Sequence, residues 1–355
     1  MKKKIIIGAC IFAMIALIVS SVIFIMQKRE GRPEIVFTKD FAQNEVFRIN
    51  SKSCFVPEIS IYMKTAEDQY TNIYGEEIWD QRIKGETLED RLKSTMLARV
   101  AQIKSMNLLA ESMEISLEDS EIELSQRAGK EYVDELSDKA ESLGVNQGLV
   151  SKMYEEYALA DKVYKKITDQ VNPEISDDEA RSITVRQIVL FKGEEAEDGS
   201  FAPYDEAKQK AIKQKAEDVL SIIRDSNGES FEDCVDKYSE SDQETLSFSK
   251  GEMPQSLEEI AFNMSNGDIS DVIETEDSYI IIQILSTFDK AATDENKVRI
   301  LRQRKKEAFD KVYNEFSAAL MSELNVKLWE SLNFRGESLN TDKNFFEVYE
   351  QVFKN

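Results

Sequence analysis

The spacing of apolar residues divides the chain into helical and sheet-forming stretches. Through Leu88–Ala110 they recur at three- and four-residue steps, which place them on one face of a helix. Ser116–Asp119 has the composition of a helix start and predicts a second helix over Ser120–Leu143. Two glycines then separate it from a third helix, predicted over Leu149–Val171.

The region before these helices has a different pattern. Val36–Phe37 and Val46–Ile49 are short apolar runs typical of strands or connectors. Pro33 and Pro57 are expected to interrupt regular structure. Arg32–Tyr74 is therefore predicted to contain only short, mixed elements.

Strand and helix patterns alternate after a hinge, Asn172–Glu179, in which a proline ends one helix and an acidic turn begins the next. Thr184–Phe191 is the clearest strand in the chain, and Ile280–Leu285 is suited to a buried strand. Helices are predicted over Tyr204–Arg224, Phe231–Tyr238 and Leu257–Met264. This mixture predicts an α+β fold of one small domain.

Helical spacing returns after Asp289. The residues that mark the apolar stripe are Phe309, Val312, Phe316, Leu320 and Leu324. They predict one helix from Thr293 to about Leu332. The chain therefore reads as helices, an α+β domain and helices again.

An uninterrupted apolar run, Ile5–Met26, follows three lysines at the N-terminus. As a helix it is about 33 Å long, enough to cross a bilayer. Ile7–Cys10 resembles a lipoprotein signal, but too few apolar residues precede Cys10 and the run continues past it. The pattern favours a retained anchor over a cleaved signal peptide or lipidation. With no second long apolar run, the remainder is predicted to be one soluble body on one side of the membrane.

Composition excludes several classes of function. A formal net charge of −23 argues against nucleic-acid binding. The chain has no histidine, which excludes imidazole bases and histidine metal sites, and its three cysteines lack metal-binding spacing. No metal and no cofactor are therefore expected. Cys54 and Cys234 are open to pairing outside the cell, although two separate small core residues is the favoured interpretation.

Several short motifs follow one another in a fixed order between Glu229 and Leu285. They are Tyr238–Ser239, Phe248–Met253, Phe262, Gly267–Ser270, Val272, Thr275 and Ser278–Ile282. In this order and spacing they resemble the second half of a parvulin-type peptidyl-prolyl isomerase domain. Thr184–Phe191 stands where that family has its first strand.

The resemblance implies an architecture. Extracytoplasmic foldases of the PrsA and SurA type insert a parvulin domain, a small four-stranded antiparallel sheet with surrounding helices, into a helical chaperone domain. The corresponding parts are a membrane anchor (1–28), a helical chaperone-like domain (29–181), a parvulin-like domain (182–289) and a C-terminal helix and tail (290–355). The last part is expected to pack back against the helical domain.

The implied function is that of a single-pass membrane protein whose soluble domains lie outside the cytoplasmic membrane. Its expected partners are unfolded or secreted polypeptides with X-Pro bonds, besides the membrane itself through residues 5–26. Rotating an X-Pro bond breaks no covalent bond, so the catalyst needs an apolar seat for the proline ring and surroundings that favour the twisted amide.

The site residues follow from the same resemblance. Met253, Leu257 and Phe262 correspond to the positions that bind the proline. The family's catalytic polar positions fall on Gln187, Ser241, Thr275 and Ile280, and the first and last of these replace histidines.

The sequence leaves two pairs of alternatives open. One alternative is a parvulin fold without activity, a binding scaffold or an adaptor for a fixed cell-envelope partner. The helical face of Leu88–Leu108 is either core or an exposed apolar groove that holds client chains.

Overall fold

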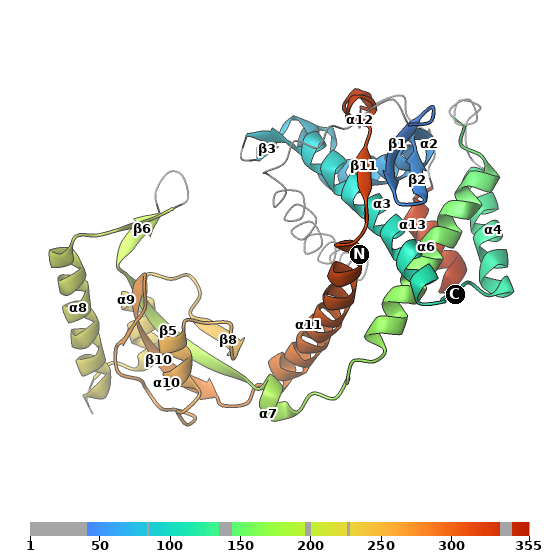
Figure 1. The fold of residues 1–355 in the computed structure, drawn as a ribbon. Coiled ribbons are helices and arrows are strands. Elements are labelled where there is room, and N and C mark those ends of the chain that lie inside the picture. The colour runs from blue at the N-terminus through green and yellow to red at the C-terminus, as the bar shows by residue number, and fades with distance from the viewer. Residues whose placement is uncertain are drawn as a thin grey trace. The chain divides into compact units, whose positions relative to one another are not determined.

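The protein is described by a computed structural model over residues 41–83, 85–134, 144–195, 200–225, 228–333 and 343–354. These residues form two compact units (Figure 1). The helical unit draws on Met1–Gln170 and Ala308–Asn355, and the sheet unit is Val171–Glu307. The predicted anchor over residues 5–26 lies outside the described residues, as does Cys10. No helix within the described ranges is long and apolar enough to span a bilayer.

The helical unit combines helices with a small three-stranded sheet of order β11-β1-β2. Its strands are β1 (Glu45–Ile49), β2 (Lys52–Phe55) and β11 (Ser322–Leu324), beside a separate short hairpin of β3 (Arg82–Ile83) and β4 (Glu86–Thr87). Its helices are α2 (Val56–Tyr74), η1 (Glu76–Asp80), α3 (Leu88–Ser112), α4 (Asp119–Val133), α6 (Gln147–Thr168), α12 (Val326–Ser331) and α13 (Phe345–Phe353). Helix α11 (Lys290–Ser317) contributes residues to both units.

Helix α2 corrects the prediction of short, mixed elements over this region. Pro57 lies in its first turn, where the missing N–H costs no hydrogen bond and the fixed φ suits a helix. Ile59, Tyr62 and Met63 are buried and recur at helical steps. The prediction was wrong because proline was interpreted as a break, whereas here it begins the helix.

The apolar face of α3 is confirmed as a helix face and lies in the core. The Thr87 hydroxyl accepts the N–H of Asp90 at 3.1 Å and caps the start of this helix. Its predicted apolar residues Leu92, Val100 and Ile103 are all buried. This face therefore belongs to the core of the helical unit and does not form an exposed groove.

Helix α4 begins within one residue of its predicted start, and its cap, Glu118, lies in the stretch predicted to begin it. The carboxylates of Glu118 and Glu121 form a reciprocal capping box. The rest of the predicted helix, residues 135–143, lies outside the described residues. In α6, the Asn146 side chain accepts the N–H of Leu149 at 3.0 Å and begins the helix.

The C-terminal stretch departs from the single long helix predicted to about Leu332. Helix α11 ends at Ser317, and β11 then pairs with β1, with Leu324 opposite Phe47. Met321 helps to hold this strand by exchanging hydrogen bonds with Asn50. Leu320 and Leu324 kept helical spacing in the sequence, but the neighbouring β1 offers unpaired backbone groups that a local pattern does not reveal.

Phe345 joins α13 to the rest of the helical unit. Its ring is fully buried and stacks on Tyr154 with the centroids 4.2 Å apart. The ring centroid of Tyr62 lies 5.1 Å from that of Phe345, and the Tyr154 hydroxyl donates to the Phe345 carbonyl at 3.0 Å. A helix from the end of the chain thus completes a core that begins at α2.

Three charged side chains meet where α2, α3 and α6 pack, and Glu58 and Lys104 are buried while Glu156 is mostly buried. Lys104 Nζ lies 2.7 Å from Glu58 Oε1 and 2.6 Å from Glu156 Oε2. Burial opposes the charge of Lys104, but the two carboxylates outweigh it and raise its pKa. Burial also raises the pKa of Glu58, to about 6, against the opposing effect of Lys104. We call Glu58, Lys104 and Glu156 the buried triad.

The buried triad predicts that the helical unit is more stable at pH 5 than at pH 7. A carboxyl whose pKa is higher in the folded state favours folding most when protonated, and that contribution is lost as pH rises through about 6. The expected gain between pH 7 and pH 5 is about 1–2 kcal/mol. Urea unfolding monitored by tryptophan fluorescence measures this change in the helical unit selectively. Trp79 and Trp329 are the chain's two tryptophans, and both belong to this unit.

Glu58→Gln is the control, because it keeps the shape of the side chain without the titration. This variant should lose the dependence between pH 5 and pH 7. An unchanged dependence in the variant, or a wild type that is weaker at pH 5, contradicts the prediction.

The sheet unit contains the predicted four-stranded antiparallel sheet, in the order β8-β5-β10-β9. Its strands are β5 (Ser182–Phe191), β8 (Thr245–Ser249), β9 (Ile273–Glu274) and β10 (Ser278–Ser286), and a separate hairpin joins β6 (Gly193–Glu195) to β7 (Phe201–Pro203). Its helices are α7 (Asp177–Ala180), α8 (Glu206–Arg224), α9 (Phe231–Tyr238) and α10 (Gln255–Ala261), joined by the first part of α11.

The two faces of this sheet are covered differently, because alternate residues of a strand point to opposite sides. On one face Ile188 and Ile281 pack with residues of α8 and α9. On the other, Val189 and Ile280 pack with residues of α10. Cys234 belongs to the first layer, and both it and Cys54 of the helical unit are buried free thiols, as the sequence favoured.

Candidate functional site

The α10 side of the sheet is the candidate site. Its apolar cluster contains Ile183, Val185, Val189, Phe248, Leu257, Ala261, Ile273, Ile280, Ile282 and Ile284, with Phe191, Leu246, Met253, Phe262 and Met264 partly buried against it. Three residues predicted to bind the substrate and one predicted catalytic position therefore lie in one cluster. We call this group of side chains the α10 cluster.

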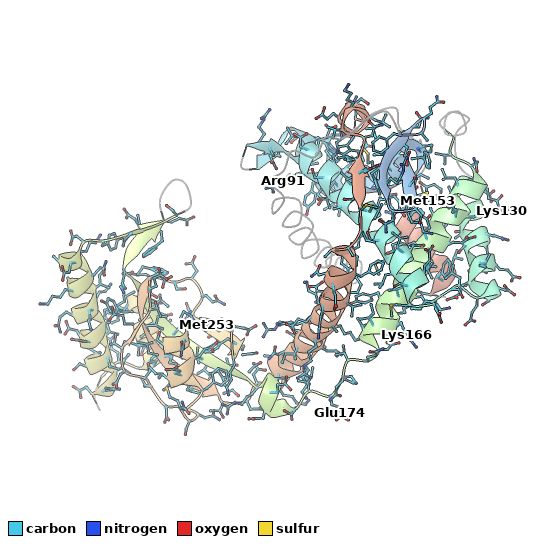
Figure 2. The ribbon with its side chains drawn as sticks, viewed as in Figure 1. Arg91, Lys130, Met153, Lys166, Glu174 and Met253 are labelled. Carbon is cyan, nitrogen blue, oxygen red and sulfur yellow. The ribbon has the colours of Figure 1, made fainter. Side chains whose placement is uncertain are left out.

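Met253 (labelled in Figure 2), Leu257 and Phe262 differ in depth within the α10 cluster. Leu257 is fully buried, whereas Met253 and Phe262 are half-buried at its edge. The turn before α10 passes through Gly251 at φ 87°, a conformation that favours glycine. Leu257 thus forms the floor of an apolar surface whose accessible parts are Met253 and Phe262.

Glu258 holds the turn that carries Met253. Its Oε1 accepts the backbone N–H groups of Glu252 and Met253, each at 2.9 Å. Burial raises the pKa of this carboxyl, but the hydrogen bonds from these backbone groups outweigh that effect and lower the pKa overall. The charge of Glu258 is therefore used to fix the backbone beside the apolar surface.

Phe262 is held from several directions. Its ring meets that of Phe248 edge-on, at 81° and a centroid distance of 5.8 Å. The guanidinium of Arg181 lies 5.2 Å from the ring centroid and donates to the Phe262 carbonyl at 3.2 Å. The amine of Lys250 lies 5.6 Å from the same centroid.

Gln187 lies on the face of β5 that carries Val185 and Val189, opposite Ile282 of β10. It is buried, and its Nε2 donates to the carbonyl of Gln243 at 2.8 Å. The N–H of Gln243 in turn donates to the Ser241 hydroxyl at 3.1 Å. Two predicted catalytic positions, Gln187 and Ser241, are therefore linked through the backbone of one loop residue.

Thr275 and Ile280 are placed differently from this polar pair. The Thr275 hydroxyl donates to Asp277 Oδ1 at 2.8 Å and accepts the N–H of Ser278 at 3.0 Å, so it organises the turn between β9 and β10. Ile280 is buried in the α10 cluster opposite Val189 and offers no polar group. The four predicted catalytic positions thus form one linked pair, one turn residue and one core residue.

The sequence interpretation did not select Arg181 and Lys250 as site residues. Lys250 lies within the matched motif Phe248–Met253, which was a usable signal. Arg181 gave none, because it meets Phe262 only through the fold. Within the described residues no cluster of His, Cys, Asp and Glu side chains could hold a metal ion.

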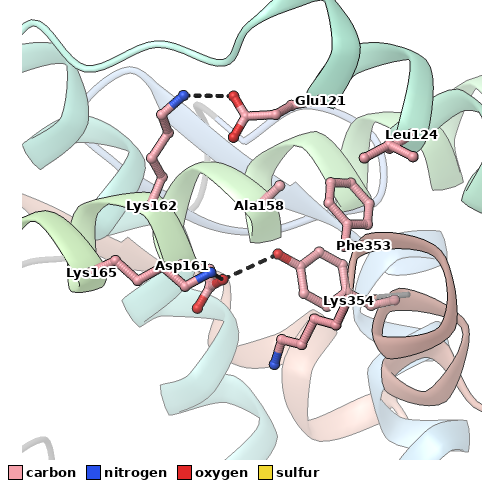
Figure 3. A pocket seen from close by; sticks show the side chains of 9 residues that line it. Glu121, Leu124, Ala158, Asp161, Lys162, Lys165, Phe353 and Lys354 are labelled. Carbon is pink, nitrogen blue, oxygen red and sulfur yellow. Dashed lines mark hydrogen bonds and ion pairs between the residues drawn. The ribbon is translucent and has the colours of Figure 1, made fainter.

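A hollow of about 170 Å³ in the helical unit is the alternative place for a ligand (Figure 3). Lys162 points to Glu121 at 2.6 Å, and Lys165 pairs with Asp161 at 2.7 Å. Lys354, which also lines the hollow, pairs with Glu350. Its cations are thus already matched by carboxylates of the same unit, and we assign it no ligand.

Comparison with known proteins finds one family model that matches part of the sheet unit. Residues 190–286 match the family model of the rotamase described as the PPIC-type PPIASE domain. The resemblance of this unit to a parvulin-type peptidyl-prolyl isomerase domain, inferred from the motifs, is thereby confirmed. None of the curated proteins compared with the chain matches it.

Several solved structures are also similar to this chain. PrsA from Bacillus subtilis is 18% identical, with 81% of this chain and 93% of that one covered and a TM-score of 0.24. PrsA from Bacillus cereus is 16% identical, with 86% and 96% covered and a TM-score of 0.34. A SurA-like chaperone of Campylobacter jejuni is 12% identical, with 79% and 99% covered and a TM-score of 0.28. Because these TM-scores are below 0.5, the likenesses support no conclusion about activity.

Proposed function

We propose that this chain is a foldase whose sheet unit isomerises X-Pro bonds of polypeptides outside the cytoplasmic membrane. The match of residues 190–286 to the PPIC-type PPIASE domain is the observation that carries the proposal. It is supported by the half-buried apolar surface of Met253 and Phe262 above Leu257. An apolar surface of this kind suits a proline ring better than a charged or hydrated group.

The proposed mechanism uses binding energy alone. The barrier to rotation about an amide bond is about 18–20 kcal/mol, because its resonance is lost at the midpoint. Met253 and Phe262 hold the proline ring. A site that binds the peptide most tightly when its amide is twisted lowers the barrier to rotation. Gln187 supports the neighbouring loop through Gln243, and no proton transfer is required.

The proposed organisation follows the same resemblance. Residues 1–28 anchor the protein as a single-pass helix in the cell membrane, 29–181 and 290–355 form a chaperone domain, and 182–289 is the parvulin-like insertion. Unfolded and secreted polypeptides with X-Pro bonds are the proposed clients.

A binding scaffold without catalysis is the second candidate. Two features favour it. Ile280 has no hydrogen-bonding side-chain group beneath the apolar surface, and the side-chain Nε2 of Gln187 already donates to the Gln243 carbonyl. A scaffold of this kind would hold proline-containing segments, or a fixed cell-envelope partner, without accelerating rotation.

Met253→Ala is predicted to lower the catalytic efficiency of X-Pro isomerisation about tenfold. The reason is the loss of half-buried apolar contact worth about 1–1.5 kcal/mol. The measurement is kcat/KM of the purified full-length protein on X-Pro peptides. Met264→Ala is the matched control, because Met264 is partly buried against the same cluster but is not a predicted site residue.

The two candidates give different results in this assay. Catalysis that is lost only in Met253→Ala supports the isomerase. No acceleration by a folded protein that still binds the peptides supports the scaffold.

A further inference from the structure

Two cations lie against the aromatic ring that is proposed to hold the proline. Lys250 Nζ and the Arg181 guanidinium carbon are 5.6 Å and 5.2 Å from the centroid of Phe262. Lys250 lies in the turn after β8, and Arg181 is the C-cap residue of α7. Two separate segments therefore bring the two charges to one ring.

Neither cation has a carboxylate partner within the described part of the chain. Arg181 donates to the Phe262 carbonyl, and its buried Nε has no hydrogen-bond partner there. Lys250 is exposed and takes part in no ion pair among the described residues. Acidic residues outnumber basic ones in this chain by 68 to 45, so a cation without a carboxylate partner is not explained by a shortage of acids.

Two acids close to Lys250 in sequence have other partners. Glu258 accepts backbone N–H groups of the turn, as described above. Glu252 accepts the N–H of Ser249 at 2.6 Å and lies 3.0 Å from Arg299. Lys250 acts on Glu258 through its charge and helps to lower the pKa of that carboxyl, but it forms no ion pair with Glu258 or Glu252 among the described residues. The hydrogen-bonding groups of the Lys250 ammonium therefore stay available to a ligand.

We infer that Lys250, with Arg181 behind it, gives the site a preference for peptides with a carboxylate side chain beside the proline. This inference rests on the proposed function, because it assigns the proline ring to Phe262. The Cα of the residue before proline is only about 3–4 Å from that of proline, so its side chain can reach groups around a ring that holds the proline. An acidic side chain meets Lys250 there, and a basic one is repelled.

Three peptides that differ only in the residue before proline test the inference. They carry Glu, its neutral isostere Gln, or Lys, and kcat/KM and Kd are measured with the full-length protein at low and at 1 M salt. For an exposed ion pair, we expect a preference for Glu over Gln of about two- to fivefold at low salt. It should shrink at 1 M salt, where screening acts over about 3 Å.

Variants of Lys250 test whether this residue causes the preference for the Glu peptide. Lys250→Met should equalise the Glu and Gln peptides, and Lys250→Glu should reverse the order of the Glu and Lys peptides. Lys210→Met is the matched control, because Lys210 is exposed and takes part in no ion pair among the described residues. It lies on α8, which covers the opposite face of the sheet, and it should leave the preference unchanged.

The outcomes separate the two proposals. Turnover or binding that does not depend on the residue before proline, or a preference that survives in Lys250→Met, overturns the inference alone. Neither turnover nor binding with any of the three peptides overturns the proposed function, and the inference with it.

Discussion

Replacing Lys104 by methionine is expected to lower the free energy of unfolding of the helical unit by about 3–5 kcal/mol at pH 7. The substitution keeps the length and apolar stem of the side chain and removes the charge that lies 2.7 Å and 2.6 Å from Glu58 and Glu156. Glu58 would then be a buried carboxylate without a compensating cation, which is among the most costly arrangements in a protein interior.

Tryptophan fluorescence during urea unfolding isolates this effect, because both tryptophans belong to the helical unit. Lys162→Met is the matched control, since Lys162 and Glu121 are each about 30% exposed and such pairs contribute at most about 1 kcal/mol. Acidification to pH 5 should restore part of the loss in Lys104→Met by protonating Glu58. Equal losses in the two variants would show that burial of the triad is not important.

Replacing Phe345 by alanine is expected to cost the helical unit about 3–5 kcal/mol. The ring is fully buried and contacts those of Tyr62 and Tyr154, which belong to α2 and α6. Its removal leaves a cavity between helices that are far apart in sequence. The stacked and tilted pairs add aromatic attraction to the loss of buried area.

Phe353→Ala, at the other end of α13, is the control. Phe353 is only partly buried and stacks on Tyr349, so its loss should cost much less than that of Phe345. Unfolding followed by tryptophan fluorescence and by circular dichroism should show a lower midpoint for Phe345→Ala by both probes. A midpoint equal to that of Phe353→Ala would contradict a central role for this ring.

The elements of the sheet unit could be predicted because their signals are local. The helix predicted over Phe231–Tyr238 agrees with α9, since Ser230 and Asp233 form a capping box that can be recognised in the sequence. The strand predicted over Thr184–Phe191 lies within β5 for a similar reason, its dense apolar run. In the helical unit, the pattern of α3 was equally clear.

The missed features depend on partners distant in sequence. Strand β11 exists because β1 pairs with it, and Glu58, Lys104 and Glu156 become a triad only when three helices pack. Helix α2 was missed for a different reason, since Pro57 can either end or begin a helix.

The candidate site could be predicted in part. The motif order identified Met253, Leu257 and Phe262, and the structure brings them into one cluster. The link from Gln187 to Ser241 passes through the backbone of Gln243, and a backbone contact has no sequence signature. The position of Arg181 beside Phe262 likewise depends on two segments meeting in space.

The division of the chain also sets an order of events on the ribosome. The sheet unit is continuous, Val171–Glu307, so all of its strands have been synthesised before α13 exists. The helical unit needs Phe345 from the far end of the chain to fill its core. A product of premature termination before Phe345 would therefore carry a complete sheet unit beside an unfilled aromatic core. Such a product is expected to expose apolar side chains of the helical unit that the full-length chain buries.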